Sequence, residues 1–150
     1  MKKLITLIAA SLMLFGTVTT IVDFHVPTMQ VQAAKYSKIN KELAQYLAEN
    51  QQYEKEGNSN FANFSTIDSI KYKGDRGLYV NVNGDFLNLS SSQKTTLLNK
   101  IQGGANTTLL DHDKIDTNDY RNGSMITVQL GNNSIGHSKI SNHKSYKFYK

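Results

Sequence analysis

The chain contains no cysteine, and this absence constrains its fold more than any other feature of the sequence. Disulfide bonds and thiolate metal sites are excluded, so a folded domain must be stabilised by the packing of its side chains alone. A lipid anchor attached through an N-terminal cysteine is excluded for the same reason.

The N-terminal 33 residues have the pattern of a secretory signal peptide. A Lys-Lys pair follows the initial Met, and an uncharged, largely apolar run covers residues 4–22. Val31 and Ala33 are small residues that suit a signal peptidase cutting before Ala34. The alternative is an uncleaved N-terminal anchor, because a run of about 19 residues approaches the roughly 20 needed to span a bilayer. We therefore predict a signal peptide over residues 1–33 and a single extracellular domain over residues 34–150, with no membrane span after cleavage.

This domain has enough apolar area for a thin core. Ile, Leu, Val and Phe supply 25 of its 117 residues, and eight tyrosines add further apolar surface. Its 15 basic and 11 acidic side chains leave a net charge of +4. A positive domain is attracted to acidic partners through its long-range field.

Two helices are expected. Apolar residues spaced for one helix face follow Ser37, and Gly57 ends that segment. Ser90 and Gln93 have the spacing of a capping box, which starts a second helix. That helix either ends at Gly103 and Gly104, or continues through them to Leu110, because Ala105 and Leu109 extend its apolar stripe.

Strands are expected in pairs after each helix. The first pair covers residues 67–72 and 78–82, and the second covers 125–130 and 135–140, with glycine-containing turns within each pair. The polar stretch 111–123 is expected to be a loop. The predicted fold is therefore α+β, a small antiparallel sheet of about four strands packed with two helices in the order αββαββ.

Four aspartates in the loop are weak candidates for a metal site. Calcium binds where several oxygens converge, and the acidic side chains are Asp111, Asp113, Asp116 and Asp119. However, an EF-hand would require a glycine at the position of Asp116, and Lys114 places a positive charge within the loop. A solvated loop is the preferred interpretation, and we expect no metal and no cofactor.

Catalytic signatures are missing from the sequence. It has no Gly-x-Ser-x-Gly elbow, no phosphate-binding loop, no dinucleotide fingerprint and no His-x-x-x-His pair. Paired carboxylates of a glycan hydrolase cannot be recognised from sequence, because their separation is a tertiary property. An enzyme is therefore the less favoured expectation, and no catalytic residue is assigned.

The C-terminal tail carries the most suggestive pattern, in which cations alternate with aromatic rings. Lysines neutralise anionic groups while aromatic rings stack on sugars or bases. The candidate residues for binding a polyanion or glycan are Lys139, His143, Lys144, Tyr146, Lys147, Tyr149 and Lys150. The alternative is a last strand over residues 145–149, with Tyr146 and Phe148 facing inward and lysines protecting its edge.

The Lys-Lys signal, the Val-x-Ala-Ala cleavage site and segments such as 86–102 and 135–150 resemble small secreted proteins of Gram-positive lactic-acid bacteria. We therefore expect a secreted, non-enzymatic module, extracellular or loosely associated with the cell wall. Its expected partner is an acidic wall polymer or an extracellular protein, and no specific nucleic acid is expected. The alternatives are a small secreted enzyme acting on wall glycan, and an inhibitor or immunity-type protein.

Overall fold

The computed structural model of the protein describes residues 35–149. The predicted signal peptide or anchor and Lys150 lie outside the described residues. None of the helices within residues 35–149 combines the length and the hydropathy that crossing a membrane requires.

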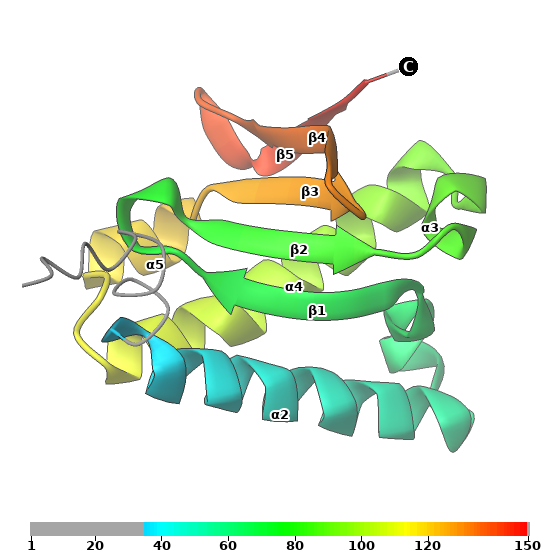
Figure 1. Ribbon diagram of the computed structural model, residues 1–150, viewed down its shortest axis with the longest axis horizontal. Coiled ribbons are helices and arrows are strands. Elements are labelled where there is room, and N and C mark those ends of the chain that lie inside the picture. Colours follow the sequence, from blue (N-terminus) through cyan, green and yellow to red (C-terminus); the bar gives the residue numbers. More distant parts are fainter. Residues whose placement is uncertain (1–34, 150) are drawn as a thin grey trace, which may run out of the picture.

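The structure is α+β, as predicted. A long helix α2 (Ser37–Lys55) is followed by the strands β1 (Ile67–Tyr72) and β2 (Leu78–Val82) (Figure 1). Then come the short helix α3 (Asp85–Asn88), the long helix α4 (Ser91–Asp111) and the short helix α5 (Thr117–Asn122). Three strands complete the chain: β3 (Ile126–Leu130), β4 (Asn133–Lys139) and β5 (Asn142–Phe148). Three single turns of 3₁₀ helix are η1 (Ser59–Phe61), η2 (Phe64–Thr66) and η3 (Gly74–Arg76).

The sheet corrects the predicted topology in two respects. It has five strands in the order β1-β2-β3-β4-β5, so β5 is added to the four expected strands. It is also mixed, because β2 and β3 are parallel while the other neighbours are antiparallel. The parallel pair has a physical cause: the connection through α3, α4 and α5 carries the chain back to the starting end of the sheet, as a helical crossover does.

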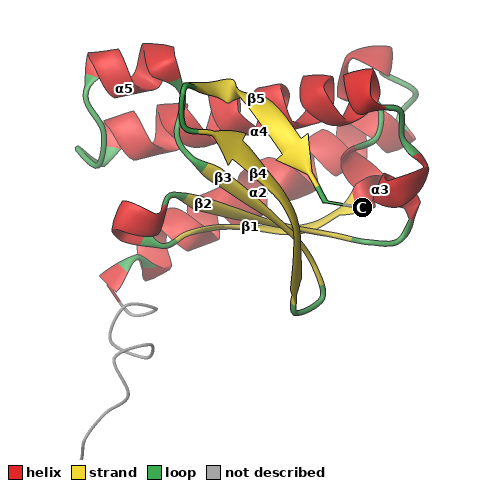
Figure 2. Ribbon diagram, turned by 90° about the horizontal axis from the view of Figure 1, so that it is seen from above, coloured by secondary structure: helices red, strands yellow, loops and turns green. Residues whose placement is uncertain are grey.

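The core lies between one face of the sheet and the two long helices. In Figure 1 the helix α4 lies behind the sheet, and α2 runs along the edge formed by β1. Figure 2 shows α4 and α5 together on one side of the strands. The buried apolar residues of α4 are Leu97, Leu98, Ile101, Ala105 and Leu109, which is the predicted stripe.

Side chains of α2 bind the backbone of the edge strand β1. The Asn40 amide accepts a hydrogen bond from the N–H of Tyr72 (2.7 Å) and donates one to its carbonyl oxygen (3.3 Å). Near the other end of the strand, Gln51 Nε2 donates to the carbonyl oxygen of Ile67 (2.8 Å). These two amides replace a neighbouring strand, so this sheet edge is closed to strand addition at both ends.

The helix α4 continues through Gly103 and Gly104. The sequence alone did not decide whether this helix ends at the two glycines. A Cβ atom on Gly104 would overlap the ring of Tyr46 in α2, whereas one on Gly103 would meet nothing within 4 Å. The Tyr46 hydroxyl donates to the carbonyl oxygen of Lys100 (3.1 Å). Gly104 is therefore the point at which a tyrosine of α2 lies directly against the backbone of α4.

Removing the Tyr46 hydroxyl should change stability at alkaline pH. Burial raises the pKa of Tyr46 from 10.0 to about 12. The folded state favours the neutral hydroxyl. Its contribution to the free energy of unfolding is therefore fully present below pH 10 and is lost as the pH rises toward 12. We expect the free energy of unfolding in urea to fall less steeply across this range in Tyr46→Phe than in the unmodified chain. Tyr53→Phe, an exposed control on the same helix, should follow the unmodified chain, and coincident curves for all three proteins would contradict the assignment.

Candidate functional site

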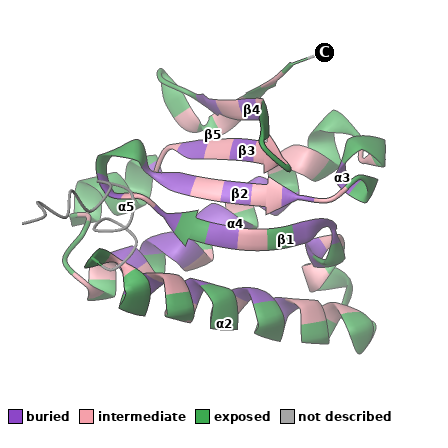
Figure 3. Ribbon diagram, viewed as in Figure 1, coloured by how far each residue is buried: buried purple, intermediate pink, exposed green. Residues whose placement is uncertain are grey.

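One face of the sheet carries no helix from residues 35–149. Along β2, the buried residues Leu78, Val80 and Val82 alternate with the half-buried Tyr79 and Asn81. Figure 3 shows the same alternation on neighbouring strands, and no described helix lies in front of β1–β3 in this view. The residues that point away from the core therefore form a continuous polar surface, as in sheets with one solvated side.

Five residues of this surface form a row across all five strands. The strand register pairs Lys71 with Tyr79, Tyr79 with Thr127, Thr127 with His137, and His137 with Lys147. With an interstrand spacing of roughly 4.8 Å, the row extends about 19 Å along the sheet from one terminal lysine to the other. We call these five residues the cross-strand row, and the helix-free surface that contains it the open face.

A second lysine reinforces one end of the row. Lys73 places its ammonium nitrogen 3.8 Å from the centre of the Tyr79 ring, which is a cation–π contact. Burial, followed by the charges of Lys71 and Arg76, lowers the pKa of Lys73 below its usual value. Three cations thus gather at this end, and a bound anion would relieve the repulsion among them.

The other end of the row combines a histidine with an aromatic ring. The rings of His137 and Tyr149 are 5.6 Å apart, and half of Tyr149 is exposed. His137 Nδ1 lies 2.8 Å from the carbonyl oxygen of Ser138. Because a carbonyl oxygen only accepts hydrogen bonds, Nδ1 carries the hydrogen and Nε2 is left for a ligand.

The strands β1–β5 carry more lysines than acidic residues, and these lysines form no ion pair within residues 35–149. Asp68 is the single acidic residue within β1–β5, whereas Lys71, Lys139, Lys144 and Lys147 all lie there. Within residues 35–149 the one ion pair joins His112 to Glu42, at 2.8 Å. The lysines of the open face therefore have no acidic partner in this part of the chain and are available to a ligand.

The structure divides the predicted tail residues among different surroundings. Lys147 and Tyr149 lie on the open face, and Lys139 follows His137 by two residues on the same side of β4. Tyr146 points to the opposite side, where its hydroxyl donates to Asn99 of α4 (2.8 Å). The predicted inward orientation of Tyr146 and Phe148 is thus confirmed, and Tyr146 is a packing residue.

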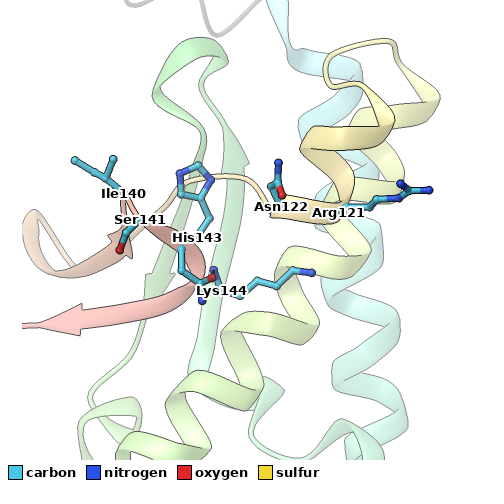
Figure 4. A pocket seen from close by; sticks show the side chains of 7 residues that line it. Arg121, Asn122, Ile140, Ser141, His143 and Lys144 are labelled. Carbon is cyan, nitrogen blue, oxygen red and sulfur yellow. Dashed lines mark hydrogen bonds between the residues drawn. The ribbon is translucent and has the colours of Figure 1, made fainter.

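His143 and Lys144 border a hollow of about 530 Å³ between the end of α5 and the β4–β5 turn (Figure 4). Its lining residues are Arg121, Asn122, Ile140, Ser141, Asn142, His143 and Lys144. An adjoining hollow of about 230 Å³ shares His143 and is also lined by Asp75, Lys114 and Asp119. We call the first of these the hairpin hollow.

The predicted loop contains α5, and two of its four aspartates, Asp116 and Asp119, cap that helix. The Asp116 carboxylate accepts hydrogen bonds from the N–H groups of Asn118 and Asp119, both at 2.8 Å, and the Asp119 side chain accepts from the Asp116 N–H at 3.4 Å. This reciprocal capping box starts the helix. Among the described residues, no group of three or more His, Asp or Glu side chains is placed to hold a metal ion.

The predicted site residues did not include five residues of this site, which are Lys71, Lys73, Tyr79, Thr127 and His137. The alternation in residues 78–82 identified a strand with one polar side, which was the available signal. No pattern along the chain indicated that this side would align with the polar sides of β3, β4 and β5. No protein family, curated protein or solved structure matches the chain.

Proposed function

We propose that the protein is a secreted, non-enzymatic module that binds an anionic polymer, such as an acidic polymer of the cell wall, across its open face. The observation that supports this proposal is the cross-strand row, with a lysine at each end and Tyr79, Thr127 and His137 between them. Such a row offers charge to phosphate or carboxylate groups, hydrogen bonds to hydroxyl groups and a ring surface to sugars.

The distribution of charge supports a chain-like ligand. Lys71 and Lys73 occupy one end of the open face, and Lys147 with Lys139 occupies the other. A small anion would contact one of these ends, whereas a polymer with repeated negative charges would contact both. Binding at two ends adds their contributions, because the second contact is intramolecular once the first has formed.

A wall-glycan-acting enzyme is the second candidate, and one observation favours it. Asp75 and Asp119 both line the hollow next to His143, and a glycan hydrolase needs two carboxylates at one cleft. The Asp119 carboxylate is already part of the α5 capping box. Loss of glycan hydrolysis on Asp75→Asn would support the enzyme, and an inactive unmodified protein would leave polymer binding as the function.

The central experiment compares polymer binding by two charge-matched double variants. Lys71→Gln/Lys147→Gln removes both ends of the row, and Lys38→Gln/Lys55→Gln removes two exposed lysines of α2. Binding of labelled polyglycerol phosphate is measured against salt concentration, with neutral dextran as the control polymer. We expect the row variant to bind about tenfold more weakly at physiological salt and to lose about 2 from the slope of log affinity against log salt.

The helix variant has the same net charge as the row variant, so it separates the site from overall charge. We expect it to retain most of the affinity of the unmodified chain. Equal losses in the two variants would reject the open face, and binding that survives about 1 M salt, where the Debye length is near 3 Å, would reject an electrostatic mechanism.

A further inference from the structure

We infer that the hairpin hollow is a second, separate binding site that holds a small oxyanion such as phosphate against a protonated His143. The site lies at the junction of α5 with the β4–β5 turn, and its ligand contacts do not involve the cross-strand row. It therefore does not depend on the proposed binding of a polymer to the open face.

The lining of the hollow suits an anion. Arg121, His143 and Lys144 supply cationic or protonatable groups, the remaining polar side chains are amides and a hydroxyl, and no carboxylate of residues 35–149 lines it. Figure 4 shows Asn122 between the strand residues and Arg121, with the Arg121 side chain directed away from His143. The groups that border the hollow directly are thus His143, Asn122 and Lys144, and Arg121 adds positive charge from one side.

The backbone holds the His143 ring in a fixed orientation. Nδ1 lies 2.7 Å from the carbonyl oxygen of Gly123, so Nδ1 carries a hydrogen and donates it. The carbonyl oxygen of His143 accepts a hydrogen bond from the buried Gln102 Nε2 (3.0 Å), which also donates to Ser124 (2.7 Å). The Gly123 contact orients the ring, and the Gln102 contact holds the backbone that carries it, so Nε2 is the nitrogen that remains for a ligand.

This geometry makes anion binding depend on protonation. A neutral His143 has a lone pair on Nε2, which repels an oxyanion, and a protonated ring donates an N–H from the same atom. The charged and titratable groups around the ring are Tyr72 from β1, Asp75 from η3, Lys114 and Asp119 before and within α5, Arg121 at its end, and Lys144 from β5. Both carboxylates line the adjoining hollow, so the oxyanion is expected on the side of Arg121 and Lys144.

The test is an NMR titration of the full chain with inorganic phosphate, in which the imidazole signals of His112, His137 and His143 are followed. We expect a saturable shift at His143 that is larger than any shift at His112 or His137, with phosphate affinity increasing as the His143 ring gains its proton. His112, already paired with Glu42, is the internal reference for unspecific ionic effects.

Two variants make the result specific. His143→Asn places an amide N–H near the position of Nδ1, which preserves the bond to Gly123, and removes Nε2; we expect at least a tenfold loss of phosphate affinity with an unchanged urea midpoint. Lys144→Gln should weaken binding about threefold, while Lys71→Gln/Lys147→Gln should leave it unchanged. The inference is overturned by an absent or unsaturable shift, by equal shifts at His112 and His137, or by full phosphate affinity in His143→Asn.

Discussion

Replacing Gln102 by Met is expected to destabilise the protein by about 2–4 kcal/mol, because two buried hydrogen bonds lose their donor at once. Gln102 is 1 % exposed, and its Nε2 donates to the carbonyl oxygens of Ser124 and His143. These residues lie just before β3 and near the start of β5, so one side chain of α4 joins two strands that are far apart in the sequence. Methionine matches the length of glutamine but leaves both carbonyl oxygens without a partner.

The measurement is the free energy of unfolding in urea, with Gln45→Met as the matched control. Gln45 lies on the exposed side of α2, where its amide contacts Glu49, so the same substitution should change stability by less than about 0.5 kcal/mol. Hydrogen exchange should show faster opening at the start of β5 in Gln102→Met. Similar stabilities for the two variants would mean that the Gln102 amide does not hold β5 to α4.

The adjacent glycines of α4 should respond to alanine with opposite signs. A Cβ on Gly104 would overlap the Tyr46 ring, and overpacking of this kind costs about 1–3 kcal/mol. At Gly103 the space is open, so alanine should stabilise the helix by up to about 1 kcal/mol through its higher helix propensity. The expected difference between the two variants is therefore about 1–4 kcal/mol, obtained from the same substitution one residue apart.

Urea unfolding of the pair measures this difference directly. Gly104→Ala combined with Tyr46→Ala provides the control, because removing the ring removes the overlap, and the double variant should then lose less than the sum of the single variants. If both glycine variants were stabilised, the close approach of α2 to α4 at Gly104 would be wrong.

Local patterns predicted much of the secondary structure. The apolar spacing after Ser37 corresponds to α2, and the Ser90–Gln93 capping box forms at the start of α4. The alternation in residues 78–82 corresponds to β2. These predictions depend on residues a few positions apart, where backbone geometry alone decides which side chains share a face.

Non-local features were predicted less well. The sequence predicts one helix and a loop between β2 and β3 and an antiparallel sheet, whereas these two strands pair in parallel. The Asp116–Asp119 capping box was interpreted as part of a loop, although the reciprocal spacing was visible. For the tail, the sequence predicts either a binding segment or a last strand with Tyr146 inward; the structure has the strand, which sends Tyr146 to the helices and Lys147 to the open face.

The amino-acid sequence by itself determined the α+β class, the start of each long helix, the positive charge and the dependence on packing without disulfide bonds. The tertiary structure decided the strand register that aligns Lys71, Tyr79, Thr127, His137 and Lys147, and the contact that requires Gly104. The physical reason is distance along the chain. Capping and periodicity act within one or two turns, whereas register and helix contact depend on how residues tens of positions apart fill one shared core.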